Sequence, residues 1–195
     1  MIPLVAAAQL IVVLGDSLAS GHGIGAAKSF PAVLQERAAE QGYPQRIVNA
    51  GVSGDTSAGG LRRLDSVLKG DVRVLVVALG ANDGLRGVPV AQVKANLSRI
   101  VGQAQARGIR VLLCGMEALP TYGWQYSVAF HQMYFDLAKQ FEVPLVPFML
   151  IDVIGNPRLM QSDHVHPNAA GARVMADHVW PYLEKLLDSQ TVPSI

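Results

Sequence analysis

The sequence predicts an α/β fold, a three-layer α/β/α sandwich whose middle layer is a five-stranded parallel sheet. Short apolar runs rich in β-branched residues alternate along the chain with longer segments in which apolar residues recur at helical spacing. Such continuous apolar runs are typical of strands that are buried on both faces of a parallel sheet. Regular alternation of strand and helix then favours helices on both faces, joined by right-handed crossovers.

The elements follow one another in a simple order. Strands are expected at residues 10–14, 47–49, 72–79, 109–114 and 143–146. Helical spacing predicts helices at residues 30–41, 56–68, 90–107 and 127–141, and a last helix at 168–187. Three glycines, Gly42, Gly70 and Gly108, fall where helices should end.

Composition indicates a compact enzyme-sized unit. At 195 residues, with 50% hydrophobic and 16% charged residues, the chain suits one domain, residues 1–195, that buries roughly 70% of its unfolded surface. A net charge of +1, with charges scattered along the chain, provides no basic field for nucleic acid. Cys114 is the only cysteine, so no internal disulfide can form, and we expect it to be a small buried hydrophobe.

The first residues bear on localisation. Residues 1–8 lack the basic leader and the full apolar stretch of a signal peptide. The apolar run that ends at Leu14 is too short to span a bilayer, so we expect no stable membrane insertion. This start would also fit the trimmed end of an exported precursor.

Two motifs at opposite ends of the chain carry candidate catalytic groups. Gly15-Asp16-Ser17-Leu18 follows the first apolar run, and Asp163 precedes His166 by three residues near the other end. A serine must give up its proton to a base as it attacks, and histidine can accept it at neutral pH. An aspartate within reach would orient that imidazole. We therefore expect Ser17 as nucleophile, His166 as general base and Asp163 as its partner.

Simpler explanations exist for each motif alone. Gly-Asp-Ser is a common turn sequence, and Asp163 to Pro167 could cap the last helix with Pro167 as its first residue. Neither explanation predicts Gly54 after the second strand or Asn82 after the third. Since ligand-binding groups gather at the carboxyl ends of parallel strands, these positions belong to one site. The N–H groups of Ser17 and Gly54 and the amide of Asn82 would supply three donors to an oxyanion.

In this order and context, Ser17, Gly54, Asn82 and His166 resemble the signature residues of the SGNH (GDSL-type) hydrolases. The motifs are most similar to the bacterial group of multifunctional acyl-thioesterases, lysophospholipases and arylesterases. The resemblance implies a flavodoxin-like fold, a Ser17–His166–Asp163 triad and an oxyanion hole of Ser17, Gly54 and Asn82. It also favours a periplasmic or secreted protein, and we expect no cofactor. One departure is His22, where the family carries an aromatic residue.

The lining of the substrate pocket is less clearly marked. His22, in a glycine-flanked loop, is a candidate for substrate contact, although a solvated loop histidine is an equal alternative. Met116, Leu119 and Tyr122 follow the fourth strand at the same sheet edge and could line an acyl pocket, or simply pack against their own helix.

Asp163, His164 and His166 superficially resemble a metal cluster. A catalytic zinc normally takes three protein ligands and a water, and a second histidine in matching context is missing, so we predict no metal site. His131 and His178 are expected on helices, at the surface or at the edge of the core. Asp16 and Asp83 are expected to bind backbone N–H groups of the loops that hold the oxyanion donors.

Three functions remain as hypotheses. The first is a serine esterase or thioesterase acting on small acyl or aryl esters, with lysophospholipid as a larger substrate. The second is a carbohydrate esterase that removes acetyl groups, and the third is a flavodoxin-like binding module that holds phosphate. An apolar slot would favour acyl chains, whereas a polar groove rimmed by aromatic residues would favour sugars. The sequence gives no indication of oligomeric state.

Overall fold

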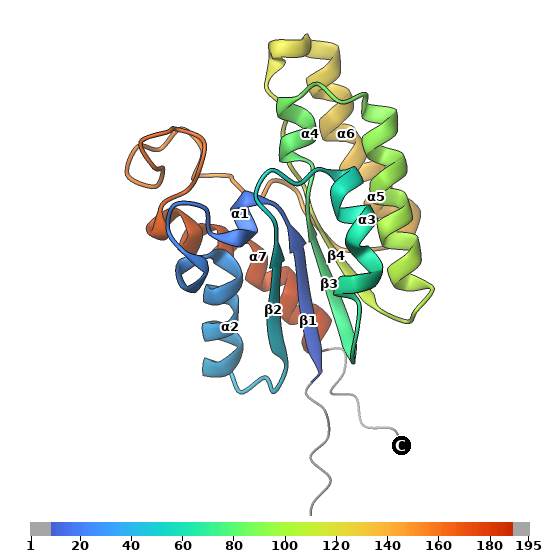
Figure 1. Ribbon diagram of the computed structural model, residues 1–195, viewed down its shortest axis with the longest axis vertical. Coiled ribbons are helices and arrows are strands. Elements are labelled where there is room, and N and C mark those ends of the chain that lie inside the picture. The colour runs from blue at the N-terminus through green and yellow to red at the C-terminus, as the bar shows by residue number, and fades with distance from the viewer. Residues whose placement is uncertain (1–8, 189–195) are drawn as a thin grey trace, which may run out of the picture.

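Five parallel strands form a single sheet in the computed structural model, which describes residues 9–188 (Figure 1). Their order is β2-β1-β3-β4-β5, the flavodoxin-like order of doubly wound sheets. The predicted fold class is thus confirmed. The strands are β1 (Leu10–Gly15), β2 (Arg46–Gly51), β3 (Val72–Ala78), β4 (Arg110–Cys114) and β5 (Leu145–Val146).

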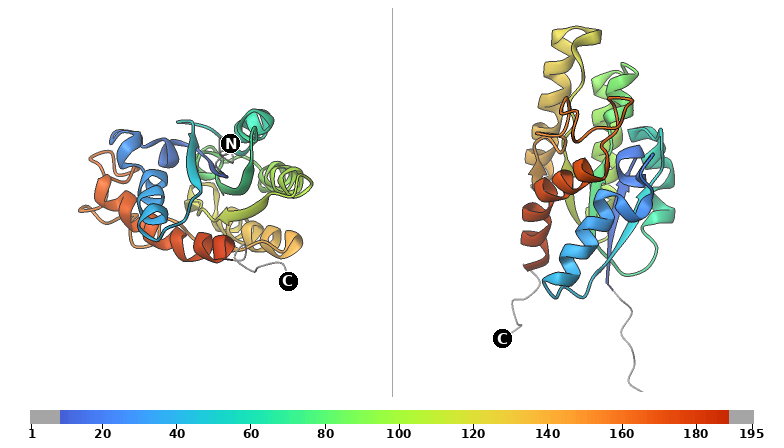
Figure 2. Two further views of the ribbon diagram at one scale, coloured as in Figure 1. Left: turned by 90° about the horizontal axis from the view of Figure 1, so that it is seen from below. Right: turned by 90° about the vertical axis from the view of Figure 1, so that its left-hand side faces the viewer.

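Helices cover both faces of the sheet, as Figure 2 shows end-on. Helix α2 (Phe30–Glu40) packs against α7 (Ala169–Asp188) on one face. On the other face α5 (Val90–Gln105) packs between α3 (Ser57–Val67) and α6 (Trp124–Phe141). These five are the helices expected from the apolar spacing.

The central strands are buried on both sides. Residues 11–14 of β1 and 74–78 of β3 are almost completely inaccessible to solvent, which explains why their sequences are continuously apolar. Cys114 is buried in β4, and burial raises the pKa of its thiol to about 12. It therefore remains neutral, as a small hydrophobe should.

The structure differs from the expected elements in two places. Strand β5 covers only Leu145–Val146, because Pro144 and Pro147 lack the N–H that would extend the ladder. Helix α6 begins one turn earlier than expected, at Trp124, after Gly123 with a φ of 94°.

Several short helical segments were not predicted. They are α1 (Ser17–Ser20), α4 (Ala81–Leu85) and the 3₁₀ turns Ala26–Lys28 and Pro120–Tyr122. They are too short to show any periodicity in the sequence. Because α1 follows β1 almost directly, Ser17 is the first residue of a helix and does not belong to the strand.

Strand register brings three loops together at one end of the sheet. Gly15, the last residue of β1, pairs with Gly51 of β2 and with Ala78 of β3. The helix α1 packs directly on these strand ends: a Cβ on Gly51 would lie 2.3 Å from the backbone nitrogen of Ser20. Glycine at this position therefore allows the loops after β1 and β2 to approach closely.

Within residues 9–188, no helix combines the length and apolar character needed to cross a bilayer. The expectation about a leader concerns residues 1–8, which lie outside the described residues. Residues 9–188 share one hydrophobic core cluster, and the single-domain assignment of residues 1–195 stays a prediction.

Candidate active site

Ser17 is presented by the turn that joins β1 to α1. Asp16 caps α1, and its Oδ1 accepts a hydrogen bond from the N–H of Leu18 at 3.0 Å. Ser17 is the first residue of the helix, where a backbone N–H has no partner within the helix. The cap thus leaves both the hydroxyl and the N–H of Ser17 at the carboxyl edge of the sheet.

His166 lies between Ser17 and Asp163. Its Nε2 is 3.1 Å from the Oγ of Ser17, and its Nδ1 is 2.7 Å from Oδ2 of Asp163. The other carboxylate oxygen of Asp163 accepts the backbone N–H groups of Val165 and His166, each at 3.0 Å. The three residues expected to form a triad are therefore within hydrogen-bonding distance in that order.

The carboxylate of Asp163 is held in its ionised form. Its pKa lies well below the usual range because the backbone N–H and the ring of His166, together with the N–H of Val165, donate to it. Its side chain is 42% exposed, so hydrogen bonds rather than burial fix its state. It can orient the imidazole throughout the neutral pH range.

A separate set of contacts fixes the loop that carries His166. Gln161 donates its backbone N–H to the carbonyl of His166 at 2.8 Å, and its Nε2 to the carbonyls of His22 at 2.7 Å and Pro167 at 2.9 Å. Pro167 pairs with Met160, and α7 begins only at Ala169. The structure therefore contradicts the alternative in which Pro167 starts the last helix.

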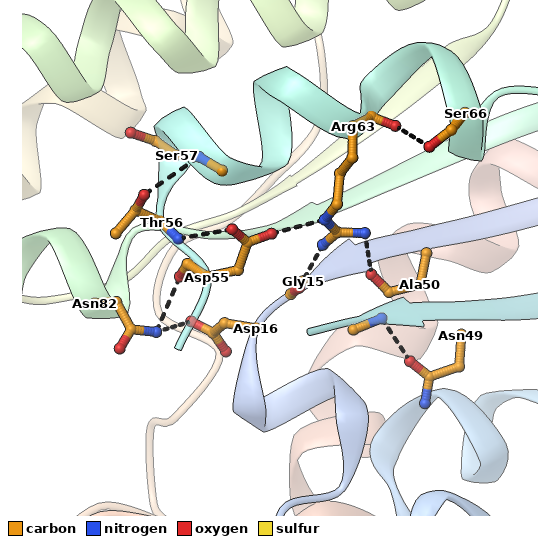
Figure 3. A network of polar contacts seen from close by, with 12 residues as sticks. Gly15, Asp16, Asn49, Ala50, Asp55, Thr56, Ser57, Arg63, Ser66 and Asn82 are labelled. Atoms are coloured by element: carbon orange, nitrogen blue, oxygen red, sulfur yellow. Dashed lines mark hydrogen bonds and ion pairs between the residues drawn. The ribbon is translucent and has the colours of Figure 1, made fainter. Parts of the chain in front are cut away.

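The expected oxyanion donors come from the three loops at the strand ends. Asn82 is the second residue of α4, and its Nδ2 donates to the carbonyl of Asp55 at 3.0 Å and to Oδ2 of Asp16 at 3.3 Å (Figure 3). Gly54 lies in the loop after β2 with a φ of 80°, and its carbonyl accepts Nη2 of Arg86 at 3.0 Å. Through Asp16 and Asp55, Asn82 is therefore hydrogen-bonded to the loops that carry Ser17 and Gly54.

The two aspartates beside these positions bind backbone N–H groups, as the sequence predicted. Asp16 is fully buried, and burial raises its pKa to about 6 against the opposing bonds from Leu18 and Asn82. Asp83 accepts the N–H of Ser57 at 2.8 Å and its hydroxyl at 2.7 Å. Both carboxylates hold loops of the site in place.

An apolar cavity of about 400 Å³ opens beside Ser17, Asn82 and His166. Met116 and Leu119, expected at this sheet edge, are in its wall. The larger apolar side chains of the wall include Leu18, Leu85, Met116, Leu119, Phe148, Leu150 and Ile154. The last three come from the segment after β5, which no motif marked; only its place at the carboxyl end of a strand could have indicated it.

His22 and Tyr122 are not among the residues that line the cavity. The ring of His22 contacts that of His166 in a tilted arrangement, with centroids 4.5 Å apart and an interplanar angle of 41°. Tyr122 donates its hydroxyl to the carbonyl of Leu85 at 3.2 Å and is exposed at the surface. His22 thus contacts the expected base rather than the cavity.

The remaining histidines lie in separate surroundings. His164 lines the cavity, and His131 contacts Glu117 with Nδ1 to Oε1 at 2.5 Å. His178 lies 3.7 Å from Asp152. No group of three or more histidine, cysteine or acidic side chains within residues 9–188 is arranged to hold a metal ion.

Comparison with known proteins shows the family of the chain. Residues 13–174 match the GDSL-like lipase/acylhydrolase family. The chain is 45% identical over 183 residues to esterase TesA of Pseudomonas aeruginosa, covering 93% of this chain and 91% of that protein. It is 38% identical over 184 residues to thioesterase 1/protease 1/lysophospholipase L1 of Escherichia coli K12, covering 94% of this chain and 87% of that protein.

A solved structure shows the same fold. The crystal structure of the psychrotrophic esterase EstA from Pseudoalteromonas sp., inhibited by monoethylphosphonate, superposes with a TM-score of 0.87 at 32% identity. The superposition covers 92% of this chain and 98% of that one. The chain therefore belongs to the GDSL-like lipase/acylhydrolase family and is a carboxylic ester hydrolase with the SGNH fold.

Proposed function

We propose that this enzyme is a serine esterase that hydrolyses small acyl or aryl esters through a covalent acyl-enzyme. The observation that carries the proposal is the chain of contacts from Ser17 Oγ through both ring nitrogens of His166 to Asp163, beside an apolar cavity. Nucleophile, base and orienting acid are the groups that acyl transfer requires.

In the first half of the reaction, Oγ of Ser17 attacks the ester carbonyl carbon while Nε2 of His166 takes the hydroxyl proton. Negative charge develops on the carbonyl oxygen. The backbone N–H groups of Ser17 and Gly54 and the side-chain amide of Asn82 would receive it. The amide of Asn82 donates to the carbonyl of Asp55 at 3.0 Å and to Oδ2 of Asp16 at 3.3 Å, and the longer of these bonds would give way to the oxyanion.

The second half returns the serine. The imidazolium of His166 gives its proton to the leaving oxygen or sulfur, which departs and leaves the acyl group on Ser17. Water, deprotonated by His166, then attacks the acyl carbon; the bond to Oγ of Ser17 breaks, His166 returns the proton to Oγ, and the acid is released. Asp163, ionised throughout, stabilises the imidazolium in both halves.

The cavity wall supports an acyl or aryl group in preference to a sugar. Its apolar side chains would leave the hydroxyls of an acetylated sugar without partners, which disfavours the carbohydrate esterase. Leu85, Leu119 and Ile154 lie in the wall and are also exposed at its rim. A longer chain could extend over this rim, so thioesterase or lysophospholipase activity, as named for the E. coli relative, is included in the proposal.

The experiment is a measurement of kcat/KM for aryl esters and acyl-thioesters of increasing acyl length, with Ser17→Ala as the blank. Turnover of short aryl esters that disappears in Ser17→Ala supports the proposal. A steep fall beyond short chains would indicate that the cavity limits the acyl group. Hydrolysis confined to acetylated sugars would instead favour the carbohydrate esterase.

A further inference from the structure

Arg63 lies outside the cavity wall but contacts three segments of the site at once. Its Nε donates to Oδ2 of Asp55 at 2.7 Å, Nη1 to the carbonyl of Ala50 at 2.7 Å and Nη2 to the carbonyl of Gly15 at 2.9 Å (Figure 3). All three guanidinium nitrogens are therefore used. One side chain from α3 joins the ends of β1 and β2 to the loop that follows β2.

Two of these acceptors lie close in sequence to expected catalytic groups. Gly15 precedes Asp16 and Ser17, and Asp55 follows Gly54. The backbone carbonyl of Asp55 accepts Nδ2 of Asn82 at 3.0 Å. The position of Arg63 thus influences all three oxyanion donors without touching substrate.

The contact between Arg63 and Asp55 is shielded from solvent. Their side chains are only 21% and 10% exposed. A planar guanidinium can satisfy a carboxylate and two carbonyls together, whereas a lysine ammonium on a flexible stem acts as a point charge. Arginine is therefore required by the number and directions of the acceptors, not only by charge.

A glycine leaves room for this arrangement. A Cβ on Gly59, in the first turn of α3, would lie 1.6 Å from Oδ1 of Asp55. That oxygen also accepts the N–H of Thr56 at 3.2 Å. Any side chain at position 59 would push the carboxylate out of the place where Arg63 holds it.

We propose that Arg63 is the positioning residue of the oxyanion hole, because it aligns the segments that carry Ser17, Gly54 and Asn82. This inference rests on the proposed esterase function. Misplacing a reacting group by about 1 Å can cost on the order of 100-fold in rate, so the effect should be seen in kcat rather than in substrate binding.

The test compares Arg63→Gln, Arg63→Lys and the wild type on a short p-nitrophenyl ester, well below the unfolding temperature. Arg63→Gln should lower kcat by about 10- to 100-fold with KM within about threefold. The kcat of Arg63→Lys should lie between those of the wild type and Arg63→Gln, because lysine keeps the positive charge but lacks the planar guanidinium with its several donors. Arg62→Gln is the matched control, since Arg62 is the neighbouring, exposed arginine of the same helix, and it should keep wild-type kcat.

A double-variant cycle separates positioning from general stabilisation. If Arg63 acts through the donors, the loss in Asn82→Ala plus Arg63→Gln should be much smaller than the product of the two single losses. The proposal would be overturned if the loss of kcat in the double variant equalled the product of the two single losses. It would also be overturned if Arg63→Gln lowered the melting temperature but left kcat unchanged.

Gly59→Ala provides a variant that should fold. Alanine is favoured over glycine in a helix, so α3 should persist while the carboxylate of Asp55 is displaced. We expect a loss in kcat of about tenfold or more. Wild-type kcat in both Gly59→Ala and Arg63→Gln refutes the positioning role, whereas an inactive wild type, or a fully active Ser17→Ala, refutes the esterase proposal itself.

Discussion

The two halves of the site are built in different ways. The acid and base, Asp163 and His166, lie three residues apart in one exposed loop and bond to each other locally. The oxyanion side joins residues far apart in sequence, because Asn82 bonds to Asp16 and Asp55, and Asp55 pairs with Arg63. Local bonding fixes a charge state, whereas the buried network fixes positions, so substitutions in the two halves should have different consequences.

The largest effect is expected where the two halves meet. Ser17→Ala should abolish hydrolysis, because no covalent route remains, and should leave the fold intact because a small side chain at the start of α1 contributes little packing. An organophosphate should label Ser17 in the wild type only. Mass spectrometry that places the adduct on a different serine would exclude Ser17 as nucleophile.

On the local half, the two histidines should respond differently. His166→Ala should be almost inactive, His164→Ala mildly affected, and Asp163→Ala should retain some activity through a poorly oriented imidazole. Asp163 itself should not make kcat/KM depend on pH in the neutral range, since hydrogen bonds lower its pKa and keep it ionised.

Chelation is the control for this assignment. The triad predicts no change on prolonged chelation, with circular dichroism to confirm that each variant is folded. Equal losses in His164→Ala and His166→Ala, together with rescue by added zinc or manganese, would show a metal site instead.

On the network half, Asn82→Ala should lower kcat by about 100-fold or more with a modest change in KM, because the amide acts mainly in the transition state. The loss arises from one donor and also from the broken link between the loops of Asp16 and Asp55. Steady-state kinetics provides the readout. A higher KM with unchanged kcat would make Asn82 a substrate-recognition residue.

The same contrast explains what the sequence could and could not predict. The Asp163–His166 pair is local, so its spacing alone indicated the contact that the structure shows. The five-stranded parallel sheet followed from apolar runs, since burial on both faces leaves a clear pattern, whereas the strand order came only with the structure. Ser17, Gly54 and Asn82 were placed together by the rule that strand ends meet at one edge.

What could not be predicted depends on tertiary contacts. Arg63 lies in an amphipathic helix, where an arginine ordinarily faces solvent, and only the fold shows that it reaches Gly15 and Ala50. The wall contributed by Phe148, Leu150 and Ile154 belongs to an irregular segment without periodicity. His22 was expected as a candidate for substrate contact, but its ring contacts that of His166, a residue far away in sequence, which no local pattern indicates.

The last effect concerns stability rather than rate, at the buried end of the network. Burial raises the pKa of Asp16 from 3.8 to about 6, so the folded state binds this proton more tightly than the unfolded state. The wild type should therefore lose stability as pH rises from about 4 to 6.5, and the loss should then level off. A shift of this size corresponds to on the order of 3 kcal/mol in unfolding free energy.

Asp16→Asn retains an oxygen to cap Leu18 but has no carboxyl to titrate, so its stability should lack this decline. The measurement is the difference in melting temperature between the two proteins from pH 4 to pH 8. A difference in melting temperature that is the same at every pH comes from the lost bond to Asn82. Only the change of this difference with pH reports the titration of Asp16. Parallel curves would show that Asp16 is already ionised at pH 4 in the folded protein, and that the network stabilises its charge more than burial opposes it.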